Sequence, residues 1–223
     1  MKTTAIITVR AGSRRVVNKN IRPFGDSNLL INKIRQLKRV PGIDNILVSS
    51  DSEEMLAMAQ QEGCDIQHRP IEYCDEKSRT FNDMVEWVME NTDTDVVVWT
   101  PCVCPFTDEN IIAEGLRAYH QYVENGDNDC VVSCRQFKEY LFDEKGPHNF
   151  SIEHHVKSQD LPDWRVIVNG FYIAKRTDMH KWRFVYGKKP YLITLSKIQA
   201  LDIDDNEDFE MADVIYKKKN NLI

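Results

Sequence analysis

The fold class is decided near the N-terminus by Thr4-Ala5-Ile6-Ile7-Thr8-Val9 and by the loop that follows it, Arg10-Ala11-Gly12-Ser13-Arg14-Arg15-Val16-Val17-Asn18-Lys19-Asn20-Ile21-Arg22. The first segment is a short apolar run, which is typical of a buried strand. The second is polar and leads to an amphipathic stretch over residues 29–37, which predicts a helix. A buried strand, a loop and a helix in this order predict a first βα unit.

The same alternation continues along the chain. Apolar runs predict strands at residues 45–49, 96–99, 130–133, 165–174 and 191–195, and helical spacing predicts helices at 53–62, about 81–88, about 112–123 and about 206–219. Each pair of parallel strands needs a crossover, usually a helix, so this order favours an α/β protein with a mostly parallel sheet covered on both faces. We therefore predict a three-layer αβα, Rossmann-like fold.

The composition favours one globular domain. The chain has 223 residues, of which 42% are hydrophobic, with 29 Lys and Arg against 35 Asp and Glu and a formal net charge of −6. This length is sufficient for one well-buried core, so we expect a single domain over residues 1–223. The acidic balance argues against a general nucleic-acid binder, and no apolar run approaches the roughly 20 residues that span a bilayer. We expect a cytoplasmic protein without nucleic-acid or membrane partners.

The regular alternation stops between residues 136 and 163. This segment is polar, is interrupted by Gly146, Pro147 and Pro162, and offers only short strand-like pieces. It has too few apolar residues to pack as a domain of its own. We therefore interpret it as an excursion from the main sheet.

The loop after the first strand concentrates positive charge. Residues 10–22 contain five basic residues and no acidic one, although the whole chain is acidic. In open α/β sheets, ligands bind at the carboxyl ends of the strands, where a turn of small residues with exposed amides and basic side chains suits a polyphosphate. A solvated basic loop is the alternative, because the segment matches neither the Walker A motif nor G-x-G-x-x-G.

A second candidate site lies near the C-terminus, in Asp202-Ile203-Asp204. Period-two spacing in an extended chain projects Asp202 and Asp204 to one side. Two carboxylates on one side are suitable ligands for Mg²⁺ in phosphoryl and nucleotidyl transfer, so we predict Mg²⁺ as the cofactor, held by this pair. We interpret the acidic residues that follow, 205–208, as favourable charges at the N-terminus of the last helix.

These segments, in this order, resemble those of the CMP-sialic acid synthetases (acylneuraminate cytidylyltransferases) and of relatives that activate other 2-keto-3-deoxy acidic sugars. The basic loop resembles the family motif R-x-x-S-K-G-x-x-x-K-N, and Ser49-Ser50-Asp51 resembles S-T-D. Arg69-Pro70-Ile71-Glu72-Tyr73 resembles R-P-x-E-L, Asn169-Gly170 resembles the N-G of a family strand, and Asp202-Ile203-Asp204 resembles D-I-D. The resemblance spans almost the whole chain and is weakest over residues 136–163.

The resemblance implies a nucleotidyltransferase fold and a reaction. CMP would pass from CTP to the anomeric hydroxyl of an acidic, sialic acid-like sugar, with release of pyrophosphate. The resemblance also implies a homodimer, in which residues 136–163 form a small dimerisation excursion that closes the partner's site.

The site residues that the resemblance implies fall into three groups. The catalytic group is Arg14, Lys19, Asp202 and Asp204. The nucleotide-binding group is Arg10, Ala11, Gly12, Ser13, Asn20, Arg69, Ser78 and Thr80. The substrate-binding group is Thr100, Pro101, Arg165, Asn169 and Gly170. For Ser78 or Thr80, the alternative is the N-cap of the helix that begins near residue 81, and Arg69 has the alternative of an ordinary loop charge.

Departures from the family pattern affect the expected substrate. The family's Q-P-T-S-P-L corresponds to Thr100-Pro101-Cys102-Val103-Cys104-Pro105. Because Thr100, Cys102 and Val103 are shorter or less polar, we expect fewer hydrogen bonds to sugar hydroxyls and a preference for a deoxy or acylamino-substituted acid over N-acetylneuraminate. The alternatives are another sugar or nucleotide, or a non-catalytic binding module. A polyanion-binding protein is disfavoured, because nothing else in the chain extends the basic loop.

Overall fold

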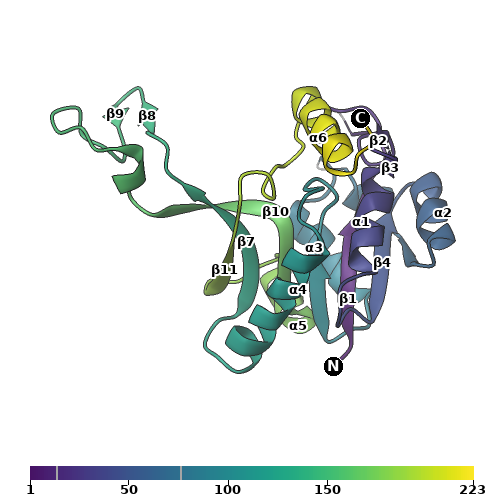
Figure 1. Cartoon of the computed structure of the whole chain (residues 1–223). Coiled ribbons are helices and arrows are strands. Elements are labelled where there is room, and N and C mark those ends of the chain that lie inside the picture. The colour runs from purple at the N-terminus through teal and green to yellow at the C-terminus, as the bar shows by residue number, and fades with distance from the viewer. Residues whose placement is uncertain (14, 76) are drawn as a thin grey trace.

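The computed structural model describes residues 1–13, 15–75 and 77–223. Its centre is a seven-stranded sheet in the order β11-β7-β10-β6-β1-β4-β5 (Figure 1). The strands are β1 (Thr3–Thr8), β4 (Asn45–Ser50), β5 (Asp65–His68), β6 (Val96–Trp99), β7 (Cys130–Phe137), β10 (Trp164–Lys175) and β11 (Pro190–Leu195). Neighbouring strands are parallel except for β10, which runs antiparallel to both β6 and β7. The predicted mostly parallel α/β sheet is confirmed.

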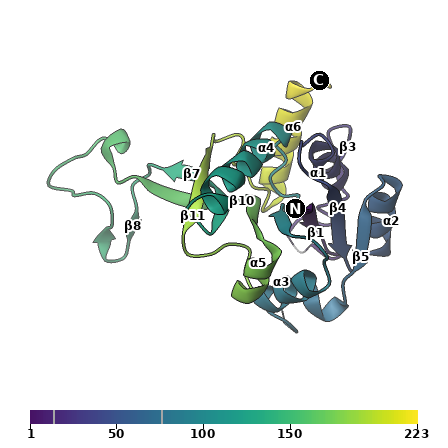
Figure 2. The ribbon, with the colours of Figure 1, turned by 90° about the horizontal axis from the view of Figure 1, so that it is seen from below.

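Helices cover both faces of the sheet. They are α1 (Leu29–Leu37), α2 (Glu53–Gln61), α3 (Phe81–Glu90), α4 (Glu109–Ala118), α5 (Arg176–Trp182) and α6 (Asn206–Lys219). Helices α1, α2, α4 and α6 pack on one face and α3 and α5 on the other (Figure 2). Successive side chains of β1 point to opposite faces of the sheet, so Ala5 and Ile7 pack in the core on one face and Ile6 packs in the core on the other. Within the described ranges, no helix is long and apolar enough to cross a membrane.

Polar side chains determine where the helices begin. In five helices the residue before the first turn accepts a hydrogen bond from a first-turn amide, which satisfies a donor that the helix itself leaves unpaired. These caps are Asn28, Ser52, Thr80, Asp108 and Asp205. Thr80 and Asp205 form complete capping boxes with Asp83 and Asp208. The starts of α3 and α6, which border the site described below, are therefore well defined.

Several short elements were not predicted. Strand β5 has four partly exposed residues at the sheet edge, and α5 has seven residues of which Met179 is buried, so neither is long enough to show a period. A small hairpin, β2 (Pro23–Phe24) and β3 (Ser27–Asn28), was also missed. The helix expected over residues 112–123 is divided, because α4 ends at Ala118 and a π-helical turn covers Tyr119–Glu124.

Residues 138–163 leave the sheet as an arm between β7 and β10 (Figures 1 and 2). The arm holds β8 (Phe142–Asp143), β9 (Gly146–Pro147) and a short 3₁₀ turn, Ser158–Asp160. Local contacts support it, such as the hydrogen bond from the Tyr140 hydroxyl to the Val156 oxygen at 2.6 Å. The excursion predicted for residues 136–163 overlaps the arm, but residues 136 and 137 still pair with β10.

Candidate active site

A cleft of about 520 Å³ opens where β1, β5 and β6 end. This is the carboxyl edge of the parallel strands, where ligands bind in open α/β sheets. Eight of the predicted site residues line it: Arg10, Ser13, Lys19, Asn20, Arg69, Thr80, Pro101 and Asp204. The cleft therefore brings together residues that are up to 194 positions apart, from residue 10 to residue 204.

The basic loop is anchored rather than loosely solvated. Val16 is 1% exposed and packs in the core, and the Asn18 oxygen accepts hydrogen bonds from the amides of Ile21 and Arg22. This tight turn requires the left-handed backbone of Asn18, with φ of 52°. As a result, Lys19 and Asn20 are presented to the cleft from a defined backbone. The alternative of a solvated loop does not describe these residues.

The first half of the loop is tied to the neighbouring strand. The Ala11 amide donates a hydrogen bond to Asp51 Oδ1 at 2.9 Å, and Gly12 follows with φ of 73°, which favours glycine. Ala11 and Gly12 are not among the described residues that line the cleft, whereas Ser13 is. Asp51 thus positions the turn, and the amide of Ala11 is engaged by protein. The predicted catalytic residue Arg14 lies outside the described residues.

The carboxylate pair is held by the main chain of the residue between them. Ile203 is fully buried, and its amide donates to the Val103 oxygen at 2.9 Å. Its oxygen accepts from Lys19 Nζ at 2.8 Å. The Ile203 side chain enters the core, Asp204 lines the cleft, and Asp202 contacts Asn169 and is not among the described residues that line the cleft.

Each carboxylate has a polar partner. Asn169 Nδ2 donates to Asp202 Oδ2 at 2.8 Å, and the Tyr172 hydroxyl donates to Asn169 Oδ1 at 2.8 Å. Arg15 forms an ion pair with Asp204 at 2.8 Å. Burial raises the pKa of Asp202, opposed by the hydrogen bond from Asn169.

The charge of Lys19 depends on the same pair. Partial burial lowers the pKa of Lys19, while the carboxylates of Asp202 and Asp204 act in the opposite direction and favour its ammonium form. Lys19 and Asp204 line the cleft, and the carboxylate of Asp202 acts on the same ammonium. A cation with two carboxylates is an arrangement suited to phosphate oxygens and their counter-ion.

Arg69 is a structural element of the cleft wall. Only 4% exposed, its guanidinium donates to the Val9 oxygen at 2.7 Å and to Cys74 Sγ at 2.9 Å. It therefore joins the end of β1 to the turn Ile71–Tyr73 and is not an ordinary loop charge. Arg10 donates to the Cys74 oxygen at 2.9 Å from the other side of this turn.

Ser78 and Thr80 have different places. Thr80 caps α3, which was its predicted alternative, and it also lines the cleft. Ser78 is exposed, hydrogen-bonds to Asp75 Oδ2 at 3.3 Å and is not among the described lining residues. The Thr80 hydroxyl itself is engaged by the cap, since it accepts from the Asp83 amide at 3.2 Å and donates to Asp83 Oδ2 at 2.8 Å.

A second cavity of about 270 Å³ adjoins the cleft, since Thr8, Phe81 and Pro101 line both. Its wall is strongly aromatic, with Trp99, Tyr172, Phe184 and Tyr186 joining Phe81, and Asn169 is a polar group on it. Because Asn169 also holds Asp202, the second cavity is connected directly to the carboxylate pair.

Three predicted sugar-binding residues, Thr100, Arg165 and Gly170, contact other protein groups and do not line either cavity. Thr100 is fully buried, and its hydroxyl donates to the Gly170 oxygen at 2.9 Å. A Cβ on Gly170 would lie 2.9 Å from the hydroxyls of both Ser133 and Thr107, so close packing requires glycine there. Arg165 forms an ion pair with Asp163 at 2.7 Å at the base of the arm. None of the three is among the described residues that line either cavity.

Several site residues were missed by sequence reasoning. Arg15 contacts Asp204, and Phe184 and Tyr186 line the second cavity from the loop after α5. Tyr172, two residues after Gly170 on β10, could have been found from its place beside the Asn169-Gly170 motif. No local signal marks Phe184 and Tyr186, because only the packing of α5 against α3 brings their loop to the cavity.

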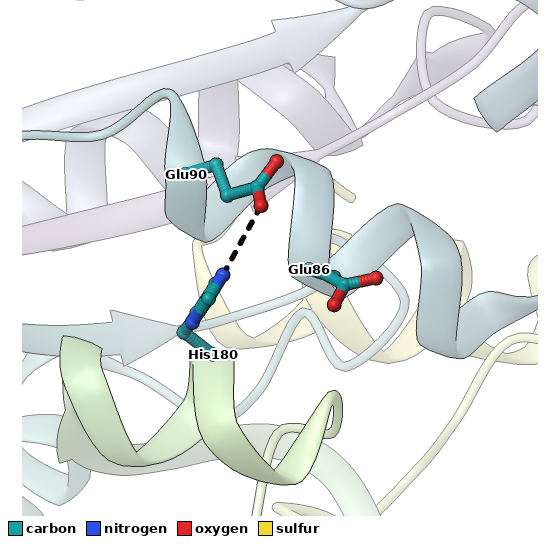
Figure 3. Close-up of side chains that lie close together, drawn as sticks. All are labelled: Glu86, Glu90 and His180. Atoms are coloured by element: carbon teal, nitrogen blue, oxygen red, sulfur yellow. Dashed lines mark hydrogen bonds and ion pairs between the residues drawn. The ribbon is translucent and has the colours of Figure 1, made fainter.

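One further cluster of possible metal ligands lies away from the cleft. Glu86 and Glu90 on α3 and His180 on α5 bring their ligand atoms within 4.8 Å of one another (Figure 3). His180 Nε2 lies 3.3 Å from Glu90 Oε1, and Glu86 is paired with Arg183 Nε at 3.0 Å. These contacts explain the cluster as polar pairing between two packed helices.

Comparisons with known proteins identify the family of the chain. A family model described as cytidylyltransferase matches residues 4–223. The chain belongs to the cytidylyltransferase family. The predicted membership and the assignment as a nucleotidyltransferase enzyme are confirmed.

Two relatives in this family are similar over nearly the whole chain. The N-acylneuraminate cytidylyltransferase of Escherichia coli O18:K1:H7 is 28% identical over 98% of this chain, which spans about half (53%) of that relative's length. The pseudaminic acid cytidylyltransferase of Campylobacter jejuni is 24% identical, with 97% of both chains covered.

Solved structures support the cytidylyltransferase fold. The CMP:2-keto-3-deoxy-manno-octonic acid synthetase, solved in complex with CTP, has a TM-score of 0.71 at 11% identity and covers 98% of this chain and 100% of its own. The 4-diphosphocytidyl-2C-methyl-D-erythritol synthase of Anaerococcus prevotii has a TM-score of 0.70 at 15% identity, over 97% of this chain and 96% of its own. The predicted nucleotidyltransferase fold is thereby confirmed.

Proposed function

We propose that the protein transfers CMP from CTP to the anomeric hydroxyl of an acidic 2-keto-3-deoxy sugar and releases pyrophosphate. The observation that carries this proposal is the place of Asp202-Ile203-Asp204. Lys19 and Val103 hold it through its central residue, and it touches both the cleft and, through Asn169, the adjoining cavity. A reaction between two substrates needs a charged centre at such a junction.

The larger cleft would take the nucleotide. Its basic residues Arg10, Arg15 and Lys19 and the hydroxyl of Ser13 are suited to the triphosphate, and Asn20 with the Arg69 wall is suited to the ribose and base. Arg14, next to Arg15 in the basic loop, is proposed to contribute to the same phosphate site. The 520 Å³ volume is within the range of small-molecule pockets.

The chemistry of the carboxylate pair fits a divalent cation. Mg²⁺ prefers oxygen ligands and is usually bound by one or two carboxylates together with substrate phosphates, which is the donor set that Asp202 and Asp204 offer. When bound, Mg²⁺ would neutralise charge on the phosphates. The ion pair of Arg15 with Asp204 would then open, and Arg15 would become available to the triphosphate.

The chain's own residues would act mainly by position and charge. Attack of the anomeric hydroxyl on the α-phosphorus needs the two substrates in line, and the two adjoining cavities would hold them in that relation. Negative charge develops on the departing pyrophosphate. The ammonium of Lys19, fixed to the Ile203 oxygen, would stabilise that charge without having to reorganise.

The aromatic wall of the second cavity supports a sugar with apolar substituents. Phe81, Phe184 and Tyr186 can bury methyl or acyl groups, whereas a polyhydroxylated chain would leave hydroxyls unpaired at about 1–3 kcal/mol each. We propose a deoxy or acylamino-substituted acid as the preferred acceptor over N-acetylneuraminate. Thr100 is fully buried and is not among the described residues that line this cavity, so it does not contribute to this preference.

We further propose a homodimer formed through the arm. Phe142 and Ile152 are 64% and 73% exposed on a segment with few contacts to the sheet, and burying them against a second copy would remove apolar surface from water. Arg165, at the base of the arm, would then serve the partner's acceptor site rather than its own, as a partner for the sugar carboxylate.

The test is pyrophosphate release with CTP, GTP, UTP or ATP against a panel of acidic sugars. We expect turnover that requires CTP, Mg²⁺ and a 2-keto-3-deoxy acid. Turnover with another nucleotide would favour a different nucleotidyl transfer. Binding of CTP with no turnover on any acid would favour a non-catalytic binding module.

A further inference from the structure

Lys33 is a fully buried lysine in the middle of α1. Burying an ammonium group is costly unless it is well hydrogen-bonded, and burial lowers the pKa of Lys33 to about 8. Its Nζ donates to two main-chain oxygens, those of Thr107 at 2.7 Å and Cys104 at 3.1 Å. A residue this costly and this specifically bonded needs an explanation beyond filling the core.

The two oxygens belong to one loop, residues 100–108, between β6 and α4. Gln36 lies one turn after Lys33 on the same face of α1, and its Nε2 donates to the Pro105 oxygen at 2.7 Å. Helix α1 therefore binds three main-chain oxygens of this loop. An apolar side chain at residue 33 would remove this donor from two of them, and of the two the Cys104 oxygen would keep only the hydrogen bond from the Thr107 amide at 3.3 Å.

The same loop supports the active site from its other side. Pro101, Cys102 and Val103 line the cleft. The Val103 oxygen accepts the hydrogen bond from the Ile203 amide at 2.9 Å, and the Thr107 hydroxyl donates to the Gln199 oxygen at 2.9 Å. The segment 199–204, which ends in the carboxylate pair, thus rests on the loop that Lys33 and Gln36 hold.

We propose that Lys33 is a positioning residue for cytidylyl transfer, holding the loop 100–108 in the conformation on which Asp202 and Asp204 are placed. The chain of contacts runs from the Lys33 ammonium to the Thr107 and Cys104 oxygens, then from the Val103 oxygen to Ile203. Lys19 fixes Ile203 from the opposite side. Displacement of reacting groups by about 1 Å can cost about 100-fold in rate, so a loosened loop would act on turnover.

This inference rests on the proposed role of the carboxylate pair, and the test separates the two. Lys33→Met keeps a similar apolar length and removes both hydrogen bonds. Ile34→Val, at the neighbouring buried position, reduces the apolar packing of α1 and removes neither of the hydrogen bonds from Lys33 to the loop, so it is the matched control. Gln36→Met is a milder loop variant, because it removes one hydrogen bond together with a buried side-chain oxygen that has no partner.

We expect kcat for pyrophosphate release to fall about 10- to 100-fold in Lys33→Met and about 3- to 10-fold in Gln36→Met, with KM for CTP within about threefold of the wild type. Hydrogen exchange should become faster in residues 101–107 and 200–204 of both variants and not in Ile34→Val. If Lys33→Met does not fold, Gln36→Met decides the question.

The outcomes are distinct. A wild-type protein without turnover on any nucleotide and acid contradicts the proposed function. An active wild type, with loop variants whose kcat and exchange match those of Ile34→Val, overturns the positioning role of Lys33.

Discussion

The ammonium group of Lys19 donates a hydrogen bond to the main-chain oxygen of Ile203 over 2.8 Å, although the two residues are 184 positions apart in the chain. This bond joins the basic loop after β1 to the segment that enters α6. It places the cation at the residue that separates the two carboxylates Asp202 and Asp204.

Lys19→Met should reduce kcat by about 100- to 1,000-fold, which is the usual effect of removing one preorganised group from a developing negative charge. Lys19→Arg keeps the positive charge but replaces the ammonium group that donates to the Ile203 oxygen by a planar guanidinium. We expect this variant to recover part of the rate. Lys218→Met, on the last turn of α6, is the control for the loss of one positive charge. Steady-state pyrophosphate release measures all three, and a Lys19→Met enzyme within fivefold of the wild type would contradict the role.

Asp202→Asn and Asp204→Asn should lower kcat by at least about 100-fold while changing CTP affinity much less, because an interaction made mainly in the transition state affects turnover. The Mg²⁺ concentration that gives half-maximal rate should rise in both. Glu207→Gln, an acidic residue of the first turn of α6, is the matched control and should behave as the wild type. Calorimetry of CTP binding to the wild type with and without Mg²⁺ gives the second readout. A wild-type affinity that is the same with and without Mg²⁺, together with an unchanged Mg²⁺ requirement for turnover in both variants, would contradict the metal assignment.

Phe184→Ala should raise KM for the acceptor about 10-fold or more and leave KM for CTP unchanged, because Phe184 lines the second cavity and not the cleft. The loss should be greatest for acceptors with acyl or deoxy-methyl groups and smallest for polyhydroxylated acids. Tyr122→Ala removes a ring that stacks on Tyr191, and neither residue is among the described residues that line either cavity, so it controls for general loss of aromatic packing. A uniform loss over all acceptors would show that the ring supports the fold rather than selecting the sugar.

Phe142→Glu combined with Ile152→Glu should convert dimers to monomers, since two charges would have to be buried in the proposed interface. Light scattering at micromolar concentration measures the oligomeric state. The control is Met211→Glu combined with Val214→Glu, at two exposed apolar positions on α6, which should leave the oligomeric state unchanged. An intact protein that is monomeric and fully active at this concentration would rule out a shared site.

Replacing Lys33 should change how stability depends on pH. The pKa of Lys33 falls from 10.5 to about 8 on folding. Between these pH values the unfolded chain binds a proton that the folded chain has released. The contribution of Lys33 to the free energy of unfolding therefore rises with pH over this range. Below pH 8 the cost of the buried charge is fully present. Lys33→Met lacks this term, so the stability of the wild type relative to Lys33→Met should increase from pH 8 to 10.5 by up to about 3 kcal/mol.

Urea unfolding of both proteins at a series of pH values measures this difference. The other titratable groups that act on Lys33 are Cys102, Cys104, Asp108 and Glu109. Burial raises the pKa of the Cys102 thiol to about 12 and that of Cys104 further still, so both thiols of the folded protein stay protonated in this window, while the hydrogen bond from Arg39 lowers the pKa of Glu109. Parallel stability curves for the two proteins would contradict the shifted lysine.

The sequence alone was sufficient for the architecture. Periods of apolar residues report burial directly, and the order of strands and helices then leaves few ways to build a parallel sheet. It was also sufficient for the two halves of the charged centre, Lys19 and Asp202-Ile203-Asp204. Loops that follow strands at the carboxyl edge of a parallel sheet meet there whatever their distance in the chain.

Only the tertiary structure decided which polar groups face a ligand and which face protein. Thr100 and Gly170 lie beside Pro101 and Asn169 in sequence, which line the cavities, yet strand packing turns Thr100 and Gly170 inward. Phe184 and Tyr186 reach the second cavity because α5 packs on α3. The same holds for Lys33, which is fully buried and donates hydrogen bonds to two loop oxygens that no local sequence pattern identifies as its partners. Local pattern determines which elements form, but the direction of a side chain relative to distant segments depends on how those elements pack, and no short stretch of sequence contains that information.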